Sequence, residues 1–207
     1  MAEKSSQERD YLPGMGKHYL LPFYDLLHRV SSLGRVHAEM VGLARPQPGQ
    51  RVLDVGCGTG NLLRATAKRH AGVELVGVDP DLKMLARAER KLRRANARLD
   101  RGFAQELAFP DDSFDVVFSS LMLHHLDSRS QDEMLAEVRR VLKPGGVLVL
   151  ADLASHGHGH GHGESGHHHG GDAVRQRIEA AGFTAEPTVL RKLRMFGTIG
   201  IEVARVH

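Results

Sequence analysis

The sequence predicts an α/β fold in which a mostly parallel sheet carries helices on both faces. Short apolar runs alternate with stretches of helical apolar spacing between residues 51 and 181. The run at 114–119 is apolar almost throughout, as expected of a strand that is buried on both faces. Alternation of this kind favours parallel strands that are joined by right-handed crossovers.

Composition sets the limits of this prediction. The 207 residues suffice for one well-packed domain, and the 41% hydrophobic and 26% charged content is that of a globular protein. A net charge of +3 gives no strong case for a nucleic-acid partner. Cys57 is the one cysteine, which excludes an internal disulfide. Because there is neither an apolar signal core nor an apolar run long enough to span a bilayer, we expect a cytoplasmic protein.

The elements follow in order. Helical stretches at about 20–30 and 35–44 precede Pro46-Gln47-Pro48-Gly49, which predicts a helical lid over 1–46 and a main domain over 47–207. The predicted strands cover residues 51–55, 74–78, 114–119 and 147–150. The predicted helices cover residues 61–70, 81–98, a segment opened by a capping box of Ser130 and Glu133, and 173–181. Two β-rich runs, 184–193 and 198–206, are expected to pair as an antiparallel edge.

Seven basic side chains lie on one face of the 81–98 segment. An RNA or membrane patch is one interpretation, and an ordinary solvated helix face is the favoured one.

A glycine-rich turn follows the first strand: Asp54-Val55-Gly56-Cys57-Gly58-Thr59-Gly60. Such a turn lets the backbone approach a ligand, and the helix after it offers free N–H groups. Asn61 stands where a dinucleotide fingerprint needs its third glycine, so that motif is absent. Asp79 ends the second strand about 20 residues further on, where it can accept hydrogen bonds from ribose hydroxyls.

Four segments then carry a resemblance: VLDVGCGTGN, VGVDP, FPDDSFDVVF and LKPGGVLVLAD. In this order and spacing, over about residues 50–152, the chain resembles a class I S-adenosylmethionine-dependent methyltransferase of the UbiE-like group that methylates small molecules. The resemblance implies a Rossmann-like, seven-stranded, mostly parallel sheet with an antiparallel C-terminal strand.

The resemblance also implies a cofactor site. Gly56, Gly58 and Gly60 would lie against the methionine part of S-adenosylmethionine, and Asp54 would orient that loop and contact the cofactor. The ribose would be held by Asp79, with Pro80 or Asp81 beside the adenine. Ala104 and Gln105 would contact the adenine amino group. Phe103 stands where an acid often precedes that alanine. Ser119 would face the site, and an N-terminal tyrosine, with Tyr19 as the candidate, would reach the cofactor carboxylate.

His124 is the candidate catalytic base, because it follows the fourth strand, where the reacting methyl group is expected. A histidine that packs against cofactor or backbone is the alternative. Asp152 is a weaker candidate for the base, and Cys57 is expected to be a small packing residue.

A histidine- and glycine-rich loop is predicted at 155–171. Its histidines are His156, His158, His160, His162, His167, His168 and His169. Imidazoles at this density suit nickel, zinc or copper. A neutral insertion, a metal-binding segment and a pH-responsive gating loop all remain open.

The function predicted is methyl transfer to a small-molecule acceptor. One alternative is a metal-binding or metal-responsive protein on the same scaffold. The other is a methyltransferase that acts on protein or RNA, which only the basic helix supports.

Overall fold

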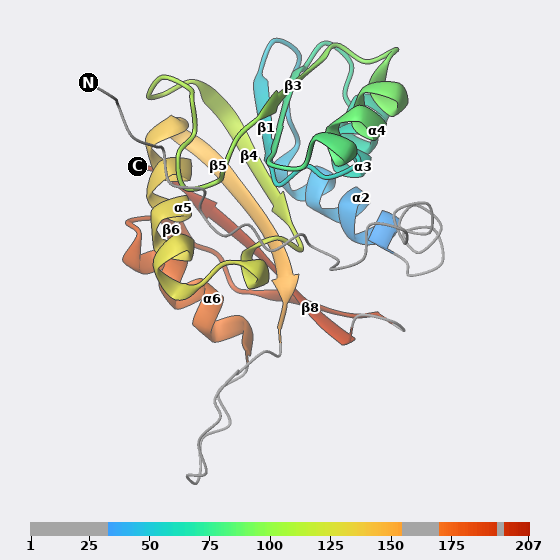
Figure 1. The fold of residues 1–207 in the computed structure, drawn as a ribbon. Helices are drawn as coiled ribbons and strands as arrows, with labels where there is room; N and C mark the ends of the chain where they lie inside the picture. The colour runs from blue at the N-terminus through green and yellow to red at the C-terminus, as the bar shows by residue number, and fades with distance from the viewer. Residues whose placement is uncertain (1–32, 155–169, 194–196) are drawn as a thin grey trace, which may run out of the picture.

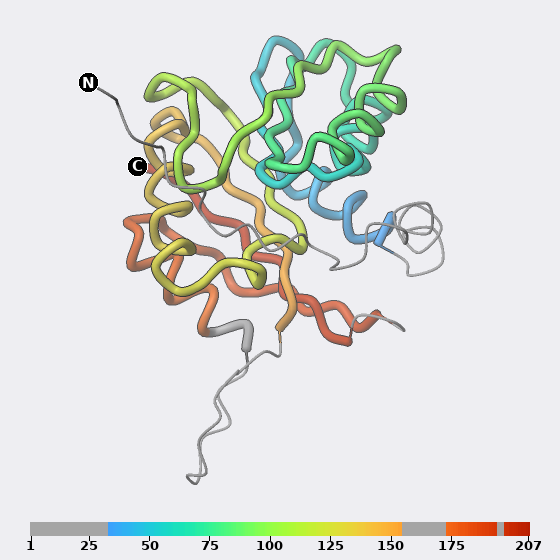
Figure 2. The backbone as a smooth tube through the Cα atoms, viewed as in Figure 1, coloured from blue at the N-terminus to red at the C-terminus, as the bar shows by residue number. Residues whose placement is uncertain are grey.

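The computed structural model describes residues 33–154, 170–193 and 197–207, with only the backbone of 170–172. Its sheet has the strand order β3-β2-β1-β4-β5-β8-β6 (Figures 1 and 2). The five strands that pair in parallel are β1 (Arg51–Val55), β2 (Glu74–Asp79), β3 (Ala97–Arg101), β4 (Phe114–Ser120) and β5 (Leu142–Leu153). Strand β8 (Gly197–Arg205) runs antiparallel to β5. The mostly parallel sheet with an antiparallel C-terminal strand is therefore confirmed.

The last position of the sheet is divided between two short strands. Strand β6 (Thr184–Ala185) and strand β7 (Val189–Leu193) both pair antiparallel with β8. The described sheet consequently has eight strands rather than seven, because Glu186, Pro187 and Thr188 interrupt the edge.

Helices cover both faces of this sheet, as predicted (Figure 1). One face carries α2 (Leu33–Ala44), α3 (Asn61–Arg69) and α4 (Leu82–Leu92), and the other carries α5 (Ser128–Val141) and α6 (Gly170–Ala180). Each face has its own apolar core, with Met40 and Leu63 in the first and Met134 and Leu135 in the second. Helix α2 belongs to the proposed lid, yet it packs into the first core, while the rest of the lid lies outside the described residues.

Two local predictions need correction. The helix predicted over 81–98 ends at Leu92, and β3 follows as an edge strand that pairs with β2. This strand has no clear apolar pattern in the sequence, because Leu99, which packs against the first core, lies between charged residues. The cap of α5 is Asp127 rather than Ser130, since its side chain accepts a hydrogen bond from the Ser130 N–H at 2.7 Å.

Candidate cofactor and methyl-transfer site

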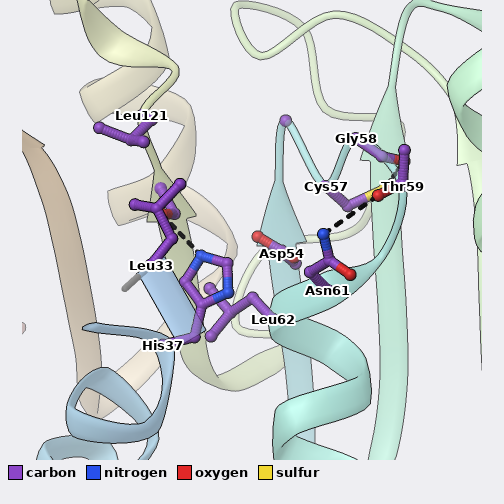
Figure 3. Close-up of a pocket in the computed structure, with 11 residues that line it drawn as sticks. Leu33, His37, Asp54, Cys57, Gly58, Thr59, Asn61, Leu62 and Leu121 are labelled. Carbon is purple, nitrogen blue, oxygen red and sulfur yellow. Dashed lines mark hydrogen bonds between the residues drawn. The ribbon is translucent and has the colours of Figure 1, made fainter. Parts of the chain in front are cut away.

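The glycine turn lies at the carboxyl ends of β1 and β2, where ligands bind in open α/β sheets. The N–H groups of Gly56 and Cys57 both donate to the Val78 carbonyl oxygen, at 2.9 and 3.0 Å, which ties the turn to β2. A pocket opens beside the turn (Figure 3). It is lined by Leu33, His37, Asp54, Gly56, Cys57, Gly58, Thr59, Asn61, Leu62, Ser120 and Leu121.

The three glycines of the turn all have positive φ, at 73°, 52° and 73°, but they serve different purposes. A Cβ at Gly56 would lie 2.5 Å from Met122 Cγ, so this position admits no side chain. A Cβ at Gly58 would meet nothing within 4 Å, so this glycine faces the open pocket. Gly60 packs closely on Ala88 and Leu92 of α4. The turn is thus fixed on its protein side and open on its ligand side.

Asp79 supports the turn from the end of β2. Its carboxylate accepts hydrogen bonds from the N–H groups of Gly58 at 2.8 Å and Asp81 at 2.9 Å. Burial raises the pKa of Asp79 above its usual value, although both hydrogen bonds lower it. Asp79, which is predicted to bind the ribose, therefore also stabilises the conformation of the glycine turn.

Asp54 is a buried acid that lines the pocket, with 2% of its surface exposed, whereas Asp79 lies behind the turn and does not line it. Burial, and then the negative charge of Asp79, raise the pKa of Asp54 to about 8. Two desolvated carboxylates side by side favour a ligand that carries positive charge. Burial and the same two acids raise the pKa of the Cys57 thiol, which agrees with a packing role for this residue.

The opposite wall of the pocket comes from α2 and from the end of β4. His37 is buried, and its Nε2 lies 3.1 Å from Ser120 Oγ. Figure 3 shows its ring between Leu33 and Leu62, with the Asp54 carboxylate across from it. Leu121 has a φ of 55°, a left-handed conformation that is rare for a bulky side chain. His37 is not predictable as a site residue from the sequence, because nothing in the local pattern distinguishes it from a solvent-facing helix residue.

His124 lies beyond this pocket, at the tips of β4 and β5. It is the middle residue of the short helix η2 (Leu123–His125), and its Nδ1 lies 2.6 Å from Asp152 Oδ1. Asp152 is 4% exposed and also accepts from the His124 N–H at 3.0 Å. Burial, and then the neighbouring His124, lower the pKa of His125, which favours its neutral form.

The remaining predicted residues are distributed around the site. Ser119 is buried at the end of β4, and its Oγ has no hydrogen-bond partner within the described part of the chain. Ala104 is buried after β3 and, like Gln105 and Pro80, does not line the pocket of Figure 3. Tyr19 and the seven histidines of the tract lie outside the described residues. Within the described ranges, no three His, Cys, Asp or Glu side chains gather as a metal site.

Comparison with known proteins finds methyltransferases. Residues 52–146 match a family model described as a methyltransferase domain. The chain is 39% identical over 140 residues to a demethylmenaquinone methyltransferase of Deinococcus radiodurans, covering 64% of this chain and 56% of the relative. It is 35% identical over 149 residues to the ubiquinone/menaquinone biosynthesis C-methyltransferase UbiE of Bordetella avium, covering 66% and 55%. The alignments thus span less than two thirds of these relatives.

A solved structure agrees at the level of the fold. The S-adenosylmethionine-dependent methyltransferase of Aquifex aeolicus has a TM-score of 0.65 and 22% identity, covering 87% of this chain and 93% of that one. The chain thus resembles S-adenosylmethionine-dependent methyltransferases in its fold, and over residues 52–146 it matches the methyltransferase domain in sequence. The curated relatives that it matches include members of the UbiE-like group. No helix of the described ranges is long and apolar enough to cross a membrane.

Proposed function

We propose that this protein transfers a methyl group from S-adenosylmethionine to a ring carbon of a small quinol. The observation that carries the proposal is the pocket lined by Asp54 and by a glycine loop that is open at Gly58, with the buried carboxylate of Asp79 holding that loop from behind. The quinone-methylating relatives support the choice of acceptor.

The described residues fit the cofactor. Asp54 lines the pocket, where the positive charge of a bound ammonium or sulfonium group would favour its ionised form, and Asp79 would accept hydrogen bonds from the ribose hydroxyls. Gly58 leaves room for the methionine part. Ser119 contributes a buried hydroxyl that forms no hydrogen bond within the described residues and could therefore bond to the cofactor. When bound, S-adenosylmethionine supplies an electrophilic methyl group whose bonding electron pair stays on sulfur.

The residue for proton removal is His124. Asp152, as a buried acceptor, favours a proton on Nδ1 of His124, which leaves Nε2 with a lone pair. That nitrogen takes the proton from a hydroxyl of the quinol. Electron density then rises at the neighbouring ring carbon, which forms the new bond to the methyl group. Loss of the ring proton from that carbon to water restores the aromatic ring as a phenolate, and His124 returns its proton to the oxygen to restore the hydroxyl.

The test uses a chemically reduced naphthoquinol with a short prenyl chain and an unsubstituted ring carbon. We expect a product with one added methyl group on carbon and both hydroxyl groups intact, as mass spectrometry and NMR would show. Methylation on oxygen, or transfer to no quinol by an enzyme that binds S-adenosylmethionine, would contradict the proposed acceptor.

Variants of His124 test the proton transfer. We expect His124→Asn to lower kcat by about 10²- to 10⁴-fold, the usual contribution of a general base, with cofactor affinity unchanged. His70→Asn, at the far end of α3, removes an imidazole away from the site and serves as the matched control. Equal activity in the two variants would exclude His124 as the base.

A further inference from the structure

Positive charge is concentrated in one short part of this chain. Residues 81–101 contain eight lysines and arginines but three aspartates and glutamates, a net charge of +5, whereas the whole chain has +3. The other residues together therefore carry a small negative charge. This segment forms α4 and β3, which lie together at one end of the sheet (Figure 1).

The fold gathers these charges on a single outer surface. Leu85, Ala88 and Leu92 bury one side of α4. Helical spacing places Lys83, Arg87 and Arg90 on the opposite side. The surface, which we call the basic edge, consists of Lys83, Arg87, Arg90, Arg93, Arg94 and Arg101.

The side-chain hydrogen bonds of Arg90, Arg93 and Arg101 do not neutralise their charge. The Nε groups of these three arginines donate to backbone carbonyl oxygens, which are neutral acceptors. Arg98 differs, because it forms an ion pair with Asp100, and it is not counted in the basic edge. The surface thus presents a net positive field to a partner.

An apolar side chain stands at the end of this surface that is nearer to the cofactor site. Leu82 is 58% exposed, the larger value of the two exposed large hydrophobic residues in the described chain. It begins α4, three residues after Asp79. Residues 81–101 contain no aromatic side chain on which nucleic-acid bases could stack. Positive charge beside an exposed leucine suits an anionic lipid surface instead.

We infer that the basic edge docks this domain on an anionic membrane surface. Each lysine or arginine close to such a surface strengthens binding roughly five-fold, so that six of them suffice for reversible attachment without a membrane-spanning helix. Docking through α4 brings Leu82 and the nearby rim of the cofactor site to the lipid. An acceptor that partitions into lipid would meet the site there.

The experiment measures sedimentation of the full chain with vesicles, in the absence of cofactor and acceptor, so its outcome is independent of the proposed reaction. Vesicles of phosphatidylcholine alone are compared with vesicles that also contain phosphatidylglycerol, at low and high salt. We expect binding only to the anionic vesicles, and its loss at high salt.

A matched pair of variants locates the surface. Arg90→Gln/Arg94→Gln is expected to weaken vesicle binding by about ten-fold or more. Arg129→Gln/Arg175→Gln, which removes the same charge from α5 and α6, is expected to change it little. An equal loss of vesicle binding in both variants would overturn the inference, because binding would then depend on the net charge of the protein and not on the basic edge. Absence of vesicle binding, with RNA binding that Arg90→Gln/Arg94→Gln abolishes, would overturn it in favour of a nucleic-acid partner. Absence of both would leave only a solvated surface.

Discussion

At the scale of single residues, the site depends on two acids that the fold holds away from water, Asp54 in the wall of the pocket and Asp79 behind the glycine turn. Asp54 and Asp79 are 2% and 7% exposed. A buried carboxylate costs free energy when it is ionised, unless a cation or hydrogen-bond donors compensate it. Asp79 has two backbone donors, whereas Asp54 has the greater burial and a pKa of about 8. The site is therefore incomplete without a cationic ligand.

Asp54 makes the stability of the ligand-free protein depend on pH. Its pKa is about 8 when folded, against 3.8 as the reference, so between these values the folded state holds a proton that the unfolded state has lost. The free energy of unfolding therefore falls as pH rises from about 4 to about 8. We expect Asp54→Asn to remove much of this slope, as thermal unfolding at several pH values would show. Parallel pH profiles for the two proteins would refute the assignment.

Asp79 should control cofactor affinity. Loss of its carboxylate removes charge-assisted hydrogen bonds and frees the Gly58 N–H, so Asp79→Ala is expected to weaken binding of S-adenosylhomocysteine at least about ten-fold. Isothermal titration calorimetry measures this. Asp132→Ala, on the exposed side of α5, removes an equal charge and should bind normally. Unchanged affinity in Asp79→Ala would remove this residue from the site.

At the scale of elements, glycine variants distinguish the effect of the glycine turn on fold stability from its effect on ligand binding. Gly58 and Gly145 both have positive φ, and a Cβ at either would meet nothing within 4 Å. Alanine at either position should therefore cost a similar amount of stability, about 1–2 kcal/mol from backbone strain. Only Gly58 lines the pocket, so Gly58→Ala should also weaken cofactor binding while Gly145→Ala should not. Equal affinities in the two variants would mean that the pocket side of Gly58 is not occupied by the cofactor.

Elements with a strong apolar pattern were predicted well, and those with a mixed pattern were not. Strands β1, β2 and β4 were placed within a residue or two, because both of their faces are buried. Strand β3 is not evident from the sequence, because it lies at the sheet edge and only Ala97 and Leu99 among its residues pack against the first core. The cap at Asp127 was missed because Ser130 and Glu133 imitate a capping box three residues later.

At the scale of the whole molecule, the site is assembled from parts that no local pattern connects. His37 and Ser120 are 83 positions apart, and the fold brings them to 3.1 Å across the pocket. The sequence pointed to the glycine turn and to Asp79, because these lie at strand ends. The wall formed by α2 depends on how that helix packs against β4 and β5, which only the tertiary structure reveals. The bond between His124 and Asp152 likewise joins two neighbouring strand ends.

The central claim is methyl transfer to a small molecule, and one labelling experiment tests it most directly. The protein is incubated with S-adenosylmethionine that is labelled in its methyl group, together with a cell extract and its small-molecule and lipid fractions. Label is then separated into protein, RNA and small molecules. We predict label in a small, organic-extractable product, and no such label with His124→Asn. Label in protein or RNA, or label that His124→Asn leaves unchanged, would contradict this account.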